Sequence, residues 1–349
     1  RRVSVQLWAS SAGCEDSPAT HGQRHLLEHL ALKGKDGTLD RRLEAKGILI
    51  TGRTFRDAMQ IEVSCLPNQV SEGLSAVAEV VETRSFKAPE IAQEAKIMRH
   101  EFALRTDAQR LGDAAWLESF GNGGLDPFGS MESLEKATPG QLSELSAAQF
   151  DPSQLAIVVA GPVDLDEVSK LALATVGKWS AGKRAERTRR GKGKAGRVEV
   201  RGAFGESRAA IVEGGSEPTT ARALCAAFAV ASQFPSAFVT YTPSLQPGLV
   251  IVGRTDEASG LGLWLDGLEG SQAMALYPIG QRLALNWIRN EMARTYGCAY
   301  WRGAMLCENP SARPEQLVDA ILAVKPAEFL QALKMFSPAE GVVTVGVPN

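Results

Sequence analysis

Two of the four histidines frame a glutamate near the amino end of the chain. His25, Glu28 and His29 form an H-x-x-E-H run. In a helix these residues share one face, because positions i, i+3 and i+4 are neighbours. Two imidazoles one turn apart can bind the same zinc ion, and the carboxylate between them can take a proton from a water molecule on that ion. The spacing therefore predicts a Zn²⁺ site rather than two ordinary packed or surface histidines.

This prediction requires a helix around the motif. Thr20 and Gln23 form a capping-box pattern, and the stretch from residue 21 to residue 33 contains no proline. Gly34 is a suitable stop. We therefore expect a helix over residues 21–33 that turns its leucines towards a core.

A second helix is expected to face the first. Pro89 is a good first helical residue, and residues 90–105 follow without a breaker. Glu94 and Glu101 are seven residues apart and so share a face. They are candidates for a third ligand and its support. The spacing alone favours a salt bridge between Glu101 and Arg105 instead.

Composition limits the class of protein. The 349 residues predict two domains, and contents of 44% hydrophobic and 22% charged residues are typical of a soluble globular protein. A net charge of −2 predicts no attraction to nucleic acid, and no apolar run is long enough to span a membrane. The five cysteines are scattered, which argues against a disulfide framework. The sequence does not begin with Met, so we expect a segment upstream; the bacterial cytoplasm and the periplasm both stay open as compartments.

A basic stretch divides the chain. Residues 183–197 hold eight Lys or Arg against one Glu and lack aromatic residues, as a solvated linker would. The predicted domains are residues 1–182, which carry the metal motif, and residues 198–349, which contain no histidine. Both parts mix strand and helix patterns, including a strand predicted at 298–306. We expect an α+β fold of two similar domains, each a mainly antiparallel sheet covered by helices.

At this point the chain resembles the pitrilysin/insulinase-type zinc metallopeptidases, the inverzincins, which include the mitochondrial processing peptidase. The resemblance is to a bacterial two-domain branch. It rests on the run from His21 to His29 with Lys33-Gly34, on the helix with Glu94 and Glu101, and on Leu125-Asp126-Pro127-Phe128-Gly129. It covers residues 1–180 well and the second half more loosely.

The resemblance implies a role for each site residue. His25, His29 and Glu101 would bind Zn²⁺, Glu28 would be the general base, and Glu94 would support the site without binding metal. This replaces the salt bridge that spacing favours for Glu101. Two histidines and one carboxylate leave a fourth position for water, as a catalytic zinc requires. The activity implied is that of a zinc endopeptidase.

The resemblance also implies a substrate and an assembly. An extended peptide or unfolded polypeptide would pair with an edge strand within residues 48–56. Two such domains would form half of a clamshell chamber, so a homodimer or a heterodimer with a homologous subunit is expected.

One departure concerns the substrate-binding Arg and Tyr that family members carry seven residues apart. Here the position seven before Tyr300 is Ala293, and the nearest arginine is Arg294. Either Arg294 substitutes from one position away, or a partner subunit supplies the pair. The alternative to an enzyme is a non-catalytic scaffold or binding subunit derived from such a peptidase.

Overall fold

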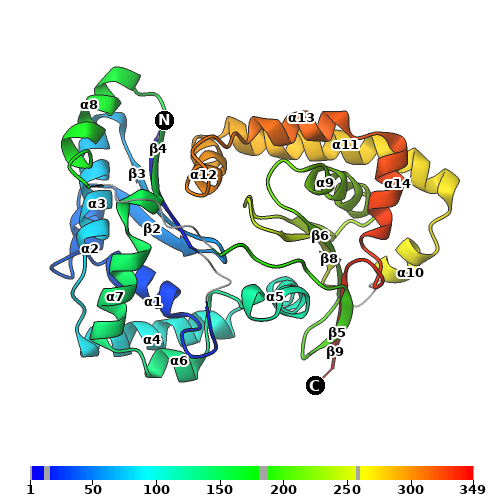
Figure 1. The fold of residues 1–349 in the computed structure, drawn as a ribbon, viewed down its shortest axis with the longest axis horizontal. Coiled ribbons are helices and arrows are strands. Elements are labelled where there is room, and N and C mark those ends of the chain that lie inside the picture. Colours follow the sequence, from blue (N-terminus) through cyan, green and yellow to red (C-terminus); the bar gives the residue numbers. More distant parts are fainter. Residues whose placement is uncertain (1, 12–15, 181–187, 257–259, 349) are drawn as a thin grey trace. The chain divides into compact units, whose positions relative to one another are not determined.

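A computed structural model describes residues 2–11, 16–180, 188–256 and 260–348. The chain forms two compact units, and each is built from three segments (Figure 1). Cys14 and residues 183–187 of the predicted linker lie outside the described residues. Unit 1 comprises Arg1–Ala103, Asp126–Thr188 and Met292–Ala312, and unit 2 comprises Leu104–Leu125, Arg189–Glu291 and Arg313–Asn349.

The division between the units falls after Thr188, inside the predicted linker, but one helix from each half of the chain belongs with the other half. Helix α5 (Asp107–Phe120) packs on the sheet of unit 2, and helix α12 (Thr295–Leu306) packs on the sheet of unit 1. Local sequence patterns do not reveal this exchange, because an apolar face does not specify which sheet it will cover. The separate roles predicted for residues 1–182 and 198–349 stay predictions.

Unit 1 contains a four-stranded antiparallel sheet in the order β2-β3-β1-β4. The pairing places Val5 opposite Val63 and Leu7 opposite Ile61, so that alternate side chains form one buried face. The elements of this unit are β1 (Val3–Ser10), α1 (Gln23–Ala31), α2 (Leu39–Glu44), β2 (Leu49–Thr54), β3 (Ala58–Cys65), α3 (Val70–Glu82), α4 (Ala88–Ala103), α6 (Met131–Glu135), α7 (Pro139–Gln149), β4 (Leu155–Ala160), α8 (Leu165–Thr175) and α12.

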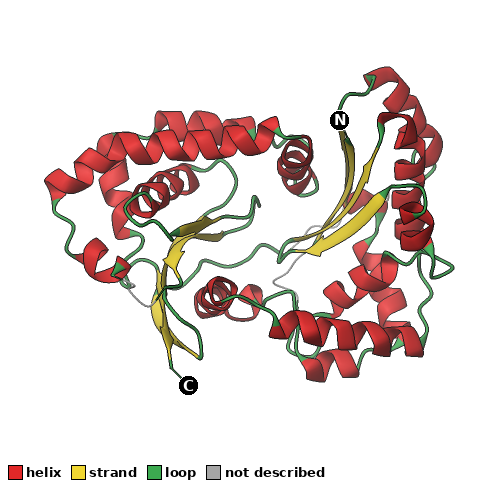
Figure 2. Cartoon of the chain, turned by 180° about the vertical axis from the view of Figure 1, so that it is seen from behind, coloured by secondary structure: helices red, strands yellow, loops and turns green. Residues whose placement is uncertain are grey.

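The two faces of this sheet carry different side chains. The residues packed against α1 and α3 are apolar, and Leu26 and Leu27 of α1 are fully buried among them. Burial of each such leucine stabilises the fold by roughly 1.5–3 kcal/mol. The opposite face, under α12, carries Gln6, Trp8 and Gln60. The sheet therefore lies between a large apolar layer and one aromatic helix (Figure 2).

Helix α1 begins later than the sequence predicts. Gly22 precedes its first turn with φ 88°, and the Thr20 side chain does not cap it. A Cβ on Gly22 would lie 2.5 Å from Cα of Gly129, so the glycine allows two chain segments to approach closely. The capping-box prediction is wrong, because Thr20 lies in the turn before the helix and its backbone carbonyl accepts from Gln23 N at 3.0 Å.

Unit 2 contains a five-stranded sheet in the order β5-β9-β6-β8-β7, antiparallel except for the parallel β5–β9 pair. Helix α5 covers one face and helix α9 the other. The mainly antiparallel α+β fold predicted from the sequence is confirmed. The elements are α5, β5 (Gly196–Arg201), β6 (Glu206–Val212), α9 (Pro218–Ala231), β7 (Phe238–Thr240), β8 (Gly248–Arg254), α10 (Leu261–Asp266), α11 (Gly270–Ala293), α13 (Glu315–Ala323), α14 (Pro326–Lys334) and β9 (Val342–Val347).

The strand predicted at residues 298–306 is wrong, since these residues lie in helix α12. Its small residues allow close contact with the sheet. A Cβ on Gly303 would overlap the indole of Trp8, and Ala304 is buried beside it. Apolar residues in a short run fit a strand or a buried helix equally well, and tertiary packing decided between them.

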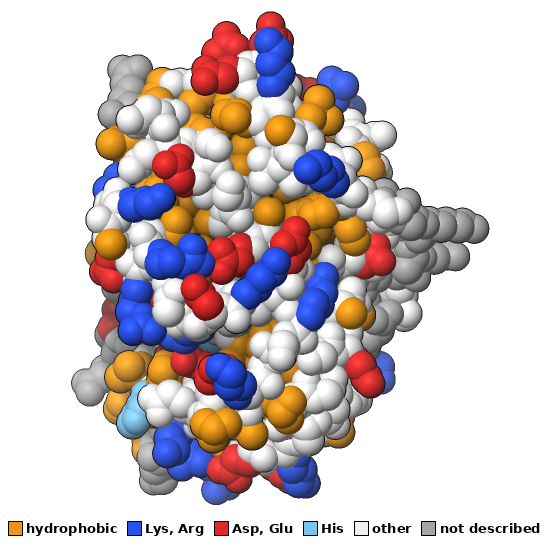
Figure 3. Space-filling model, turned by 90° about the vertical axis from the view of Figure 1, so that its left-hand side faces the viewer, with side chains coloured by type: hydrophobic (Ala, Val, Ile, Leu, Met, Phe, Trp, Pro, Cys, Tyr) orange, Lys and Arg blue, Asp and Glu red, His pale blue; other side chains and the backbone are white. Residues whose placement is uncertain are grey.

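The outer surface of unit 1 has no dominant charge. On the face shown in Figure 3, basic and acidic side chains alternate with apolar ones. This agrees with the net charge of −2. Among the described residues, no helix is both long and apolar enough to cross a bilayer.

Candidate metal centre

Three donor atoms from two helices converge in unit 1. Nε2 of His25 lies 3.2 Å from Nε2 of His29, and each of these nitrogens lies 3.6 Å from Oε2 of Glu101. The histidines come from α1 and the carboxylate from α4. Both imidazoles are largely buried, whereas the Glu101 side chain is 38% exposed.

This triangle of donors fits a zinc ion. Bonds of 2.0–2.1 Å in a tetrahedral arrangement place two donors about 3.4 Å apart. The observed separations of 3.2, 3.6 and 3.6 Å lie on both sides of that value. Two nitrogens and one carboxylate oxygen are also the donor set of many catalytic zinc sites. His25, His29 and Glu101 could therefore hold the metal.

Helix α4 presents Glu101 to the histidines because it packs beside α1. Ile91, Ala95 and Met98 bury one stripe of α4, and Glu94 lies next to this stripe. The helix ends at Ala103. The spacing argument for a Glu101–Arg105 salt bridge assumed that the helix continued to Arg105, and it does not.

Glu94 supports His29 from behind. Its Oε2 lies 3.1 Å from Nδ1 of His29, and its Oε1 lies 3.4 Å from Nζ of Lys33. A carboxylate on Nδ1 fixes the tautomer that leaves Nε2 free for a metal. The charge of Lys33 in turn favours the ionised form of Glu94.

Glu28 lies on the same helix but faces strand β2. It is 3% exposed, and its Oε2 accepts a hydrogen bond of 2.7 Å from Oγ1 of Thr54. A Cβ on Gly52 would overlap Oε1 of Glu28. The absence of a side chain at Gly52 therefore allows the carboxylate to lie directly against the strand. Glu28 also has a carboxylate oxygen within 4.8 Å of the histidine donors.

Burial controls the protonation of two of these groups. It lowers the pKa of His25 to about 3, with smaller contributions from the charges of His29 and Arg24. Burial raises the pKa of Glu28 to about 7, although the Thr54 hydrogen bond acts in the opposite direction. His25 is thus neutral and able to donate a lone pair. Glu28 has the affinity for a proton that suits a base near neutral pH.

The other two groups respond mainly to each other. Burial alone would lower the pKa of His29, but the hydrogen bond to Glu94 and the nearby carboxylates outweigh it and raise the pKa. Burial opposes the ionisation of Glu94, yet the contacts with His29 and Lys33 prevail and lower its pKa. Each residue of the pair thus favours the charged form of the other, a protonated His29 and an ionised Glu94.

The stretch from Asp126 to Gly129 lies against the start of α1. The backbone carbonyl of Asp126 is 2.7 Å from Nε2 of His21, and the ring of Phe128 is 5.8 Å from that of His25. Sequence analysis singled out this stretch only through its resemblance to a family motif. The contact with Phe128 helps to bury His25.

Arg294 and Tyr300 occupy different surroundings from the metal donors. Arg294 immediately precedes α12 with an extended backbone. The ring of Tyr300 lies 5.2 Å from that of Trp8 and 5.8 Å from that of Phe55, on the aromatic face of the sheet. A role for either residue in substrate binding stays a prediction.

Sequence analysis missed Gly52 and Thr54 as site residues. Both lie within the strand predicted to bind peptide, but nothing in their types indicates contact with Glu28. The side chains of a strand point alternately to its two faces, so the strand prediction alone places Ile50, Gly52 and Thr54 on one face. This was the one sequence feature that could have linked Gly52 and Thr54. Which helix that face would meet depended on tertiary packing.

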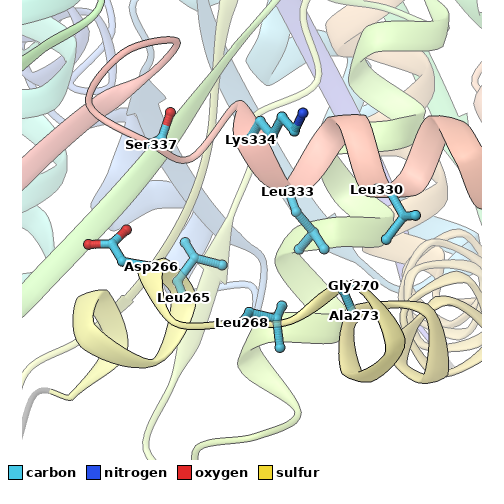
Figure 4. Close-up of a pocket in the computed structure, with 9 residues that line it drawn as sticks. All are labelled: Leu265, Asp266, Leu268, Gly270, Ala273, Leu330, Leu333, Lys334 and Ser337. Atoms are coloured by element: carbon cyan, nitrogen blue, oxygen red, sulfur yellow. The ribbon is translucent and has the colours of Figure 1, made fainter.

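Unit 2 contains a cavity whose lining differs from the metal site in being mainly apolar. Its volume is about 500 Å³, and leucines from the α10–α11 region and from α14 point towards one another across it (Figure 4). Its lining is mainly apolar and contains no histidine or cysteine: Leu265, Asp266, Leu268, Gly270, Ala273, Leu330, Leu333, Lys334 and Ser337. This cavity cannot form a site of the histidine type.

The match with a known family covers the metal site. Residues 1–112 match the sequence model of insulinase, Peptidase family M16. The resemblance drawn from the sequence is confirmed. This range includes both helices that carry His25, His29, Glu94 and Glu101, whereas unit 2 lies mostly beyond it.

Sequence relatives of about half of the chain are named as a zinc protease and as a processing-peptidase subunit. An uncharacterized zinc protease of Mycobacterium leprae is 26% identical over 179 residues, which are 49% of this chain and 40% of the relative. A probable mitochondrial-processing peptidase subunit beta of Arabidopsis thaliana is 23% identical over 176 residues, 48% of this chain and 33% of the relative. The chain thus spans less than half the length of these curated relatives.

The fold similarity extends over the whole chain. The crystal structure of a protease from Helicobacter pylori superposes with a TM-score of 0.81 at 13% sequence identity, covering 99% of this chain and 94% of that protein. At this identity the similarity shows the fold alone. The fold of both units is therefore shared with a protease structure, while the site must be argued from its own residues.

Proposed function

We propose that this protein is a zinc-dependent endopeptidase that cleaves peptides or unfolded protein segments. The observation that carries the proposal is the triangle of donors from His25, His29 and Glu101 beside a buried Glu28. The family match over residues 1–112 supports it, as does the name of the Mycobacterium leprae relative, a zinc protease.

Each residue has a distinct task in this proposal. His25, His29 and Glu101 would hold the ion, which when bound supplies a Lewis acid that polarises the peptide carbonyl and lowers the pKa of water. Glu28 accepts the proton of the attacking water and later delivers it to the leaving amine nitrogen. Thr54 holds one oxygen of Glu28 and so orients the other.

Strand β2 is the proposed docking site for the substrate. It forms an edge of the sheet in unit 1, and Gly52 and Thr54 face Glu28. An extended peptide can add to such an edge through main-chain hydrogen bonds, with little dependence on its side chains. This geometry would bring a peptide bond next to the base and would exclude folded proteins.

We further propose that the active form contains a second subunit, as a homodimer or a heterodimer that completes a chamber. The Arabidopsis thaliana relative is itself named a subunit. The change to Ala293 at the expected arginine position motivates the heterodimer. Light scattering tests this, since a purified chain that is monomeric and fully active would exclude the requirement for a partner.

The test of the function is cleavage of an unstructured peptide by zinc-reconstituted protein. The Glu28→Gln variant should lose activity by a factor on the order of 10²–10⁴ while it binds one zinc ion. Glu44→Gln is a matched control, because Glu44 is an exposed carboxylate at the end of α2 in the same unit. It should leave cleavage unchanged.

Two outcomes would contradict the proposal. Equal activity of wild type and Glu28→Gln would remove Glu28 as the base. A well-folded protein that binds no stoichiometric zinc and cleaves no peptide would favour the non-catalytic scaffold or binding subunit instead.

A further inference from the structure

The edge strand β2 presents two different faces. Gly52 and Thr54 face Glu28, as the hydrogen bond from Thr54 and the close approach of Gly52 demonstrate. Arg53 lies between them in sequence and therefore points to the opposite face of the sheet. That face is the one covered by α12. The strand thus separates the residues of the metal site from an exposed arginine.

Arg53 rests on an aromatic platform. Its guanidinium carbon lies 5.6 Å from the centre of the Tyr296 ring, a distance typical of a cation–π contact. Tyr296 is stacked on Tyr300 with ring centres 5.8 Å apart, and Tyr300 packs on Trp8. The platform therefore continues into the core of unit 1.

Polar contacts also fix Tyr296. Its hydroxyl donates to Oε1 of Gln60 at 3.4 Å, and its backbone carbonyl accepts from Nε2 of Gln6 at 3.3 Å. Both glutamines are anchored in strands of the same sheet. Arg53 is thus held at the end of a rigid stack, and less side-chain entropy is lost when it binds a partner.

The charge of Arg53 is available to a ligand. The side chain is exposed, and among the described residues its charge acts on Glu62 and Glu28 without a salt bridge to either. Glu62 shares this face with Gln6, and its Oε1 accepts a hydrogen bond of 2.8 Å from the Ser4 hydroxyl. Burial raises the pKa of Glu62, although the Ser4 hydrogen bond and the charge of Arg53 act in the opposite direction. Glu28 also feels the charge of Arg53 but lies on the other face. The guanidinium can therefore donate hydrogen bonds to a carboxylate from outside the chain.

We propose that Arg53 gives the enzyme a preference for substrates with an acidic residue next to the cleavage site. This inference rests on the function proposed above. A peptide residue paired directly opposite Arg53 places its Cβ about 4.5–5.5 Å away on the same face. The adjacent peptide residue then lies opposite Gly52, beside Glu28. An Asp or Glu opposite Arg53 can form the paired hydrogen bonds that guanidinium and carboxylate prefer.

The experiment moves one Glu through a neutral, unstructured peptide and locates the cleaved bonds by mass spectrometry. Wild-type protein should cleave preferentially at a fixed distance from the Glu, with kcat/KM on the order of 10-fold above the Gln peptide, because hydrogen bonds between charged groups are stronger than those between neutral groups and exposure to water reduces the difference. The Arg53→Gln variant should lose this ratio. Arg53→Glu should reverse it in favour of Lys.

A matched control and a non-catalytic readout accompany this test. Arg41 is an exposed arginine of α2 in the same unit, and Arg41→Gln should keep the wild-type ratio. Binding of the Glu and Gln peptides to the Glu28→Gln variant should show the same preference without cleavage. Tyr296→Leu should weaken the preference, because it removes the platform, whereas Tyr296→Phe should retain most of it.

The outcomes separate this inference from the function itself. If zinc-loaded wild type cleaves no peptide, the proposed function fails. If it cleaves peptides regardless of the position of the Glu, or if Arg53→Glu keeps the wild-type preference, the assignment of Arg53 is wrong and the peptidase proposal stands.

Discussion

The two units use helix-covered sheets of similar kind but place polar residues differently. In unit 1, helix α1 buries its leucines and leaves His25 and His29 facing α4. In unit 2, helix α9 is buried along nearly its whole surface, because α13 and α14 pack over it. A helix enclosed on all sides must be apolar. The candidate metal site therefore lies in the unit whose helix keeps one face uncovered by an apolar layer.

The comparison also explains why histidine is restricted to one unit. All four histidines, His21, His25, His29 and His100, belong to unit 1. In unit 2, α9 carries Cys225, which is fully buried, and burial raises the pKa of its thiol to about 12. A thiol of that kind is a packing residue rather than a ligand.

The largest expected effect is the loss of the metal from unit 1. His25→Ala or His29→Ala should reduce bound zinc from one ion per chain to none, because two donors cannot form a tight site and unit 2 offers no histidine in its place. Zinc analysis after dialysis measures this. Residual stoichiometric zinc in a variant that carries both His25→Ala and His29→Ala would mean that the chain binds zinc elsewhere. The two units would then not differ in metal binding as expected.

The second effect concerns stability in metal-free protein. The pKa of Glu28 is about 7 in the folded state and about 4.5 ordinarily, so folding favours its protonated form. The stability contribution is complete below the unfolded pKa and is lost as the pH rises through 7. Ionised Glu28 should then cost about 3 kcal/mol at pH 8. Glu28→Gln should therefore gain about that much relative to wild type between pH 5 and pH 8.

Urea unfolding of chelator-treated protein tests this difference. Groups that titrate in both proteins and lie away from Glu28 cancel to first order when the two free energies of unfolding are subtracted. Parallel pH profiles for wild type and Glu28→Gln would show that the buried carboxylate is not destabilised.

A smaller effect on zinc affinity is expected at Glu94, which contacts Nδ1 of the proposed ligand His29. Glu94→Gln keeps the shape of the side chain but removes the charge beside His29, so zinc affinity should fall on the order of 10- to 100-fold. Competition with a chromogenic chelator measures the affinity. Glu90→Gln is the control, because Glu90 is a half-buried glutamate of the same helix whose carboxylate pairs with Lys87 and not with a histidine. An unchanged affinity in Glu94→Gln would mean that the hydrogen bond does not support the ligand.

The smallest effects are expected at two glycines of unit 1, one packed against Glu28 and one with open space around it. Gly52→Ala should destabilise the protein by about 1–3 kcal/mol, since the new methyl group would overlap Glu28. Gly140→Ala lies inside helix α7 with open space around it and should stabilise the protein by up to about 1 kcal/mol. Thermal unfolding compares them. Equal and small shifts would show that the contact between β2 and Glu28 relaxes easily.

The sequence predicted the fold class and most elements correctly because hydrophobic periodicity is a local property. The helices predicted over residues 21–33 and from Pro89 onwards are confirmed within a few residues. The errors lie where the local pattern was ambiguous. Residues 298–306 are apolar enough for either a strand or a buried helix, and Thr20 fits either a cap or a turn.

By itself, the sequence indicated two of the proposed donors and the proposed base: two imidazoles and a carboxylate on one helical face follow from the order His25, Glu28 and His29. Tertiary structure decided what completes the site. Glu101 meets the histidines only because α4 packs on α1, and Gly52 meets Glu28 only because β2 lies at the edge beside that helix. Residue spacing fixes neighbours within one helix, whereas contacts between helices and strands depend on how their apolar faces pack.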